Sequence, residues 1–109
     1  MCGFLLNISD KGLTKRKIIS VNQSLHKRGP DQNGNLTFKT FSGNKVDMIH
    51  TRLEISGLGK GGSQPMENER YIILFNGEIY NYIELSKLYG LEYKNGDTKV
   101  LLDLITKFG

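Results

Sequence analysis

The chain contains 109 residues, of which 38% are hydrophobic and 24% are charged, and its formal net charge is +4. A chain of this length buries roughly 65% of its extended surface on folding, which is enough for one modest core but not for two domains. The composition excludes an intrinsically disordered chain and a membrane protein, so we expect a soluble globular fold.

The cysteine content and the lysine-rich stretches indicate the cellular setting. Cys2 has no second cysteine with which to form a disulfide. The apolar run from Cys2 to Leu6 is shorter than the roughly 7 to 15 residues of a signal-peptide core. We therefore expect a cytoplasmic location without membrane attachment. The basic stretches 11–17 and 26–28 lack interleaved aromatic residues, and we interpret them as solvated surface rather than as a nucleic-acid site.

The first predicted elements are a strand and a helix. Residues 3–8 predict a strand with apolar side chains on both faces, as in a strand that is covered on both sides. Cys2 would then begin a buried strand. From about Thr14 to Lys27, apolar residues recur at helical spacing, and Gly29-Pro30 ends the pattern.

Short strands and two further helices are predicted next. Asn33-Gly34 predicts a hairpin-type turn before an alternating run at 36–41. A turn at Ser42-Gly43-Asn44 leads into a run at 46–53, which predicts another strand. A compact apolar run at 71–75 predicts a strand that ends at Asn76-Gly77, and helices are expected at about 80–89 and 98–108.

The stretch 57–62 matches G-x-G-x-x-G, the pattern of a dinucleotide-binding turn. Such a site needs a helix that begins at the glycines, and Ser63-Gln64-Pro65 does not resemble a helix start. We interpret the stretch as a mobile, glycine-rich surface loop.

Cys2 is the most informative residue, because removal of Met1 would leave a thiol and a free α-amino group on one residue. An α-amino group has a reference pKa of about 7.7 to 8.0, so it can act as a base close to its own nucleophile near neutral pH. The alternative is a small buried hydrophobic residue at the start of a strand.

Four further polar groups stand at predicted strand ends or loops, and Asn76-Gly77 counts as one of them. Asn76 and Gly77 can present an amide and a backbone N–H toward one point, as an oxyanion hole requires, or they can form an ordinary turn. Arg52 can bind a carboxylate through two parallel hydrogen bonds, or it can lie on the surface. Glu78 can receive an ammonium group, or it can be an exposed acid near a helix start. Asp97 is also a good helix N-cap candidate.

Taken together, these features resemble a known family, the class II glutamine amidotransferases, and more narrowly the glutaminase domain of asparagine synthetases. The motifs that carry the resemblance are Met-Cys-Gly at 1–3, Arg-Gly-Pro-Asp at 28–31, Arg52-Leu53 with Ile55, Gln-Pro-Met at 64–66, Phe-Asn-Gly-Glu-Ile-Tyr-Asn-Tyr at 75–82, and Asp97 with Val-Leu-Leu at 100–102. The chain departs from the family pattern at Lys27 and around Asp97, where Gly-Asp-Thr-Lys at 96–99 replaces Ser-Asp-Thr-Glu.

The resemblance implies a role for each candidate residue. Cys2 would be the nucleophile that attacks the side-chain amide of L-glutamine, with its own α-amino group as the proton shuttle. Asn76 and Gly77 would hold the oxyanion, and Arg52 would bind the α-carboxylate of glutamine. Three further residues would complete the substrate site: Glu78 and Asp97 at the α-ammonium, and the backbone around Ile55. No metal ion is expected at this site.

The resemblance also implies an α+β fold, namely the four-layer α-β-β-α sandwich of N-terminal nucleophile hydrolases. Residues 1–109 would supply only the N-terminal part of that domain, and the ATP-dependent synthetase domain would lie outside the chain. ATP and Mg²⁺ are expected in that domain or subunit and not here. Uncovered sheet edges and apolar faces would favour homo-oligomers.

Two hypotheses remain open on the sequence. In the first, the chain is the glutaminase part of an enzyme that amidates aspartate, a sugar or another carboxylate. In the second, it is a catalytically inactive fragment that serves as an assembly module.

Overall fold

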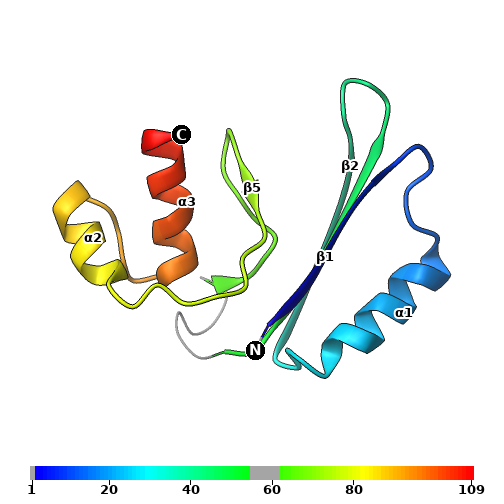
Figure 1. Cartoon of the computed structure of the whole chain (residues 1–109), viewed down its shortest axis with the longest axis horizontal. Helices are drawn as coiled ribbons and strands as arrows, with labels where there is room; N and C mark the ends of the chain where they lie inside the picture. The colour runs from blue at the N-terminus through cyan, green and yellow to red at the C-terminus, as the bar shows by residue number, and fades with distance from the viewer. Residues whose placement is uncertain (1, 55–61) are drawn as a thin grey trace.

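The structure is a computed structural model that describes residues 2–54 and 62–109. The described residues form antiparallel sheets together with helices, which confirms the mixed α+β class (Figure 1). In chain order the elements are β1 (Gly3–Ser9), α1 (Lys15–His26), β2 (Gln32–Lys39), β3 (Lys45–Arg52), β4 (Met66–Glu67), β5 (Ile72–Ile73), α2 (Tyr82–Tyr89) and α3 (Asp97–Phe108). The glycine-rich stretch 57–62 falls, except for Gly62, outside the described residues.

The main sheet has the strand order β1-β3-β2, so β3 is its central strand. Gly3 pairs with Thr51 and Gln32 pairs with Arg52 in antiparallel register. Extending the first ladder by one residue places Cys2 opposite Arg52. Because paired residues share a face of the sheet, Cys2, Arg52 and Gln32 form a row across the end of one face.

Helix α1 covers the opposite face of the sheet (Figure 1). It begins after Thr14, whose hydroxyl accepts a hydrogen bond from the N–H of Lys17 at 3.2 Å. The Thr51 hydroxyl donates to the carbonyl of Leu25 at 2.9 Å and thus ties β3 to the last turn of α1. The predicted helix is therefore confirmed, with its ends within one residue of the expected positions.

The face that carries Cys2 and Arg52 is only partly covered. Val46 and Met48 of β3 are buried there, but on the neighbouring strand β1 Phe4, Leu6 and Ile8 are 44%, 50% and 60% exposed. The expectation that β1 is covered on both sides is therefore wrong for this chain. In Figure 1, α2, α3 and β5 stand on this side of the sheet and spread away from β1 toward the top of the view.

The hairpin-type turn predicted at Asn33-Gly34 is also wrong, because both residues lie inside β2 and pair with Thr51 and His50. A Cβ atom on Gly34 would lie 1.8 Å from the carbonyl oxygen of Gln64. Glycine is thus needed here for a close approach of two backbones and not for a turn. The turn at residues 42–44 is confirmed, with Gly43 at a φ of 88°.

The second half of the chain combines a short hairpin with two helices. β4 pairs with β5 through Met66 and Ile73, so the strand predicted at 71–75 is confirmed only at its centre. The predicted helices are confirmed as α2 and α3, which pack together through an edge-to-face contact of Tyr89 and Phe108. In the described part of the chain, no helix is both long and apolar enough to cross a membrane.

Candidate active site

A cavity of about 320 Å³ opens at the end of the sheet where β1 begins and β3 ends. This volume lies at the lower end of the range for small-molecule sites, roughly 300 to 1,000 Å³. Six of the seven residues predicted for the site line it: Cys2, Arg52, Asn76, Gly77, Glu78 and Asp97. The seventh, Ile55, lies outside the described residues, as does Met1.

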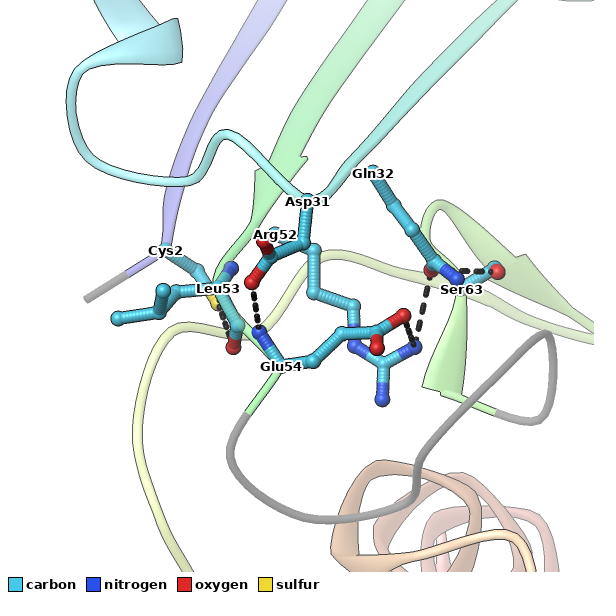
Figure 2. A network of polar contacts seen from close by, with 7 residues as sticks. All are labelled: Cys2, Asp31, Gln32, Arg52, Leu53, Glu54 and Ser63. Carbon is cyan, nitrogen blue, oxygen red and sulfur yellow. Dashed lines mark hydrogen bonds and ion pairs between the residues drawn. The ribbon is translucent and has the colours of Figure 1, made fainter.

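Cys2 is half-buried directly before the first residue of β1. Its sulfur lies against the backbone of Leu53, which follows β3: the Leu53 N–H donates to Sγ at 3.4 Å, and the Leu53 carbonyl lies 3.8 Å from Sγ (Figure 2). On the other side, Arg28 Nε donates to the carbonyl of Cys2 at 3.1 Å. Cys2 is thus contacted at both its sulfur and its backbone carbonyl.

Arg52 is 4% exposed, so the alternative of a surface arginine does not apply. Its Nη1 donates to the side-chain carbonyl of Gln32 at 2.9 Å and lies 3.7 Å from a carboxylate oxygen of Glu54 (Figure 2). Gln32 also accepts a hydrogen bond from Ser63. These contacts hold the guanidinium at the cavity, where it can receive a carboxylate.

Asp31 supports the same strand end, although sequence analysis gave it no role. Its N–H donates to the carbonyl of Arg52 at 2.9 Å, and its carboxylate accepts from the N–H of Glu54 at 2.8 Å. The Arg-Gly-Pro-Asp motif at 28–31 therefore braces the chain on either side of Leu53. Gly29 allows this approach, because a Cβ there would lie 2.5 Å from the backbone of Thr51.

Asn76 and Gly77 were predicted to follow a strand directly, but β5 ends at Ile73, and Leu74 and Phe75 lie between. Asn76 is half-buried and Gly77 is exposed, and both line the cavity. The backbone of the preceding residue, Phe75, is held by the side chain of Gln64 through two hydrogen bonds of 2.6 and 3.1 Å. An amide side chain and a backbone N–H are thus available at one wall of the cavity.

The two acids of the site differ in burial. Asp97 is buried in the first turn of α3, and its Oδ2 accepts from the N–H of Ile79 at 3.0 Å. The N-cap of α3 is Gly96, at a φ of 91°, so the N-cap alternative for Asp97 is wrong. Glu78 is exposed at the cavity edge. One cation and two anions therefore line the same cavity.

His50 and Gln64 are buried beside the site, and sequence analysis assigned a role to neither. His50 lies in the centre of β3 at 1% exposure, and its Nε2 has no hydrogen-bond partner among the described residues. Burial and the charge of Arg52 lower the pKa of His50, against a smaller opposing effect of the Phe75 backbone. Within residues 2–54 and 62–109, no three His, Cys, Asp or Glu side chains gather as a metal site would need.

The chain is similar to proteins of one family along its whole length. The family model described as "Glutamine amidotransferase domain" matches residues 1–109. The chain is 34% identical to "Putative asparagine synthetase [glutamine-hydrolyzing] 2" of Methanocaldococcus jannaschii, over 91% of this chain and 22% of that protein. It is 39% identical to "Asparagine synthetase [glutamine-hydrolyzing] 1" of Bacillus subtilis, over 94% of this chain and 17% of that protein.

The chain is also similar to a plant protein. The chain is 35% identical to "Asparagine synthetase [glutamine-hydrolyzing]" of Zea mays, over 100% of this chain and 19% of that protein. The chain thus spans about a fifth of the length of the curated relatives that it matches. No solved structure matches it significantly.

Proposed function

The chain belongs to the glutamine amidotransferase domain family, in the class II branch related to the glutaminase domain of asparagine synthetases, and we propose that it hydrolyses L-glutamine to glutamate and ammonia. This proposal rests on one observation: Cys2, Arg52 and the Asn76–Gly77 turn line the same cavity. These groups come from three distant parts of the sequence.

The charges around the cavity match the two ends of a free amino acid. Arg52 would bind the α-carboxylate, and Asp97 with Glu78 would hold the α-ammonium. The backbone around Ile55 would line the substrate. A glutamine within a peptide has neither charged group, so we expect the site to reject it.

In the proposed reaction, the sulfur of Cys2 attacks the side-chain carbonyl carbon of glutamine. The carbonyl electron pair moves to the oxygen, where the Asn76 amide and the Gly77 N–H stabilise the negative charge. The α-amino group of Cys2, free after removal of Met1, takes the thiol proton and passes it to the departing nitrogen, which leaves as ammonia. Water then attacks the thioester, with the same amine as the base, and glutamate leaves as the thiol is restored.

The wider context of the reaction is also part of the proposal. We infer that residues 1–109 form the N-terminal part of a four-layer α-β-β-α sandwich of the N-terminal nucleophile type. The ammonia would pass to a synthetase domain or subunit, in which ATP and Mg²⁺ would activate a carboxylate, with aspartate as the acceptor. Sugars or other carboxylates are alternative acceptors, and the expected setting is the cytoplasm.

A second candidate function is that of an inactive assembly module. The exposed side chains of Phe4, Leu6 and Ile8 on β1 favour it, because contiguous exposed apolar residues mark interaction surfaces. The two functions differ in one measurable property, the reactivity of Cys2.

The test uses the full chain and begins with its intact mass, which establishes whether Met1 has been removed. We expect the processed chain to release ammonia from glutamine, and to gain the mass of one adduct when treated with an electrophilic glutamine analogue. Cys2→Ala should abolish both, whereas Asn33→Ala, an exposed residue on the α1 side of the sheet, should leave both unchanged.

A processed, folded chain that gives neither ammonia nor adduct would refute the glutaminase proposal and leave the assembly module. An adduct that persists in Cys2→Ala would refute the assignment of Cys2 as the nucleophile.

A further inference from the structure

Gln64 is 6% exposed, and both ends of its side-chain amide bond to the backbone of Phe75. The Phe75 N–H donates to Oε1 of Gln64 at 2.6 Å, and Nε2 of Gln64 donates to the Phe75 carbonyl at 3.1 Å. A longer contact of 3.5 Å joins Nε2 to the hydroxyl of Thr98 in the first turn of α3. Gln64 therefore connects the end of β5 to the start of α3.

The strand register explains this geometry. Met66 pairs with Ile73 and Glu67 with Ile72, so two more steps along the antiparallel ladder place Gln64 opposite Phe75. Pro65 stands between Gln64 and β4 and has no N–H to donate. In a regular antiparallel ladder, two opposing backbones exchange a pair of hydrogen bonds. Here the side chain of Gln64 exchanges such a pair with the backbone of Phe75.

The backbone of Gln64 packs closely against the main sheet. Its carbonyl oxygen lies so close to Gly34 of β2 that a Cβ atom on Gly34 would approach it to 1.8 Å. The two hydrogen bonds to Phe75 thus come from a residue that packs against β2.

The segment after Phe75 is held at both ends. Phe75 precedes Asn76 and Gly77 directly, and beyond Glu78 the N–H of Ile79 donates to Asp97. Gln64 on one side and Asp97 on the other therefore fix the three residues 76–78, which include both proposed oxyanion donors.

We propose that Gln64 is a positioning residue that sets the location of the oxyanion hole by continuing the β4–β5 ladder with its side chain. This inference rests on the proposed glutaminase function. Gln64 need not touch the reacting atoms, and its effect reaches them through Phe75. A displacement of an oxyanion donor by about 1 Å can lower a rate by about 100-fold.

The kinetic test compares Gln64→Met with the wild-type chain. Methionine keeps the length of the side chain but removes both hydrogen bonds to Phe75. We expect kcat for glutamine to fall by about 10- to 100-fold, while KM changes by less than about threefold, because Arg52 and Asp97 remain in place. The matched control is Gln23→Met on the exposed side of α1, which should match the wild type.

A second measurement does not depend on activity. Hydrogen exchange of the Phe75 amide, followed by NMR, should be slow in the wild type and faster in Gln64→Met. The variant Gln64→Glu keeps an acceptor for the Phe75 N–H and loses the donor to the Phe75 carbonyl. A carboxylate oxygen then faces the Phe75 carbonyl oxygen, so we expect kcat to fall in this variant as well. If Gln64→Met does not fold, Gln64→Glu provides the test, and a wild-type kcat in folded Gln64→Glu would overturn the positioning role.

The outcomes separate the two proposals. An active wild type with unchanged kcat in Gln64→Met, or unchanged Phe75 exchange in a folded Gln64→Met, would overturn the positioning role alone. A large rise in KM at unchanged kcat would also overturn it, because substrate binding would then be the property affected. A wild-type chain without turnover or Cys2 adduct would overturn the glutaminase function, and with it any catalytic role of Gln64.

Discussion

At the scale of single residues, Glu54 places a carboxylate where the substrate would place its own. Its oxygen lies 3.7 Å from Nη1 of Arg52, and the side chain is 26% exposed. An ion pair of this kind contributes about 0.2 to 1 kcal/mol, so its competition with a ligand is modest.

We therefore predict that Glu54→Gln lowers the KM for glutamine by up to about fivefold at unchanged kcat, since an attraction of up to about 1 kcal/mol is removed from Arg52. Steady-state kinetics of ammonia release measure this change. Glu69→Gln, at an exposed position between β4 and β5, is the control. A rise in KM would instead indicate that Glu54 holds the substrate ammonium group.

His50 makes stability depend on pH. Burial lowers its pKa in the folded chain, so the unfolded chain takes up a proton first as the pH falls through about 6.5, the unfolded value. Above that pH, the neutral His50 ring makes its full contribution to the free energy of unfolding. This contribution is lost toward lower pH, by at most about 1.4 kcal/mol per pH unit.

We predict that urea unfolding at pH 7 and pH 5 gives a smaller difference in free energy for His50→Gln than for the wild type. The exposed His26 is the matched position, and His26→Gln should keep the wild-type difference. Equal differences in the wild type and His50→Gln would contradict the assignment of this pH dependence to His50.

At the scale of elements, the sequence predicts the helices and strands whose signals lie within the element itself or directly beside it. Helix α1 was expected at Thr14 to Lys27 and runs between these two residues, because a threonine cap and Gly29-Pro30 mark its ends. The turn predicted at Asn33-Gly34 is wrong, because Gly34 is required for a close approach to Gln64, which lies 30 residues further along the chain. β4 was missed since it has two residues, and the roles of Gln64 and His50 depend on pairings that no local pattern contains.

The close approach at Gly34 gives a prediction at this scale. Gly34→Ala places a methyl group against the Gln64 carbonyl, so β2 and the backbone of Gln64 must separate, and we expect a loss of about 1 to 3 kcal/mol in the free energy of unfolding. Chemical denaturation measures the loss. Asn35→Ala, at the next and exposed position of β2, should change the free energy by less than about 0.5 kcal/mol. A neutral Gly34→Ala would refute the contact.

At the scale of the whole molecule, β1 presents three exposed apolar side chains on the face that also carries the candidate site. Exposed apolar patches of this kind favour association. We predict that the chain self-associates as its concentration rises, and that Leu6→Ser with Ile8→Ser reduces the association. Sedimentation velocity over a range of concentrations measures both. The matched control is Ile19→Ser on α1, an exposed apolar residue outside this face.

A wild-type chain that stays monomeric at high concentration would contradict this prediction. If Ile19→Ser reduced the association equally, the surface involved would lie elsewhere.

The pairing of β1 with β3 has a further consequence for the start of the chain. Side chains alternate between the two faces of a strand, so the count of residues from Cys2 to the first ladder pair, Gly3 with Thr51, decides the side on which the sulfur emerges. One amino acid inserted between Cys2 and Gly3 would move the Cys2 side chain to the other face of the sheet, the face that α1 covers. The proposed role of Cys2 as a nucleophile thus depends on the register of β1 as much as on the chemistry of the thiol.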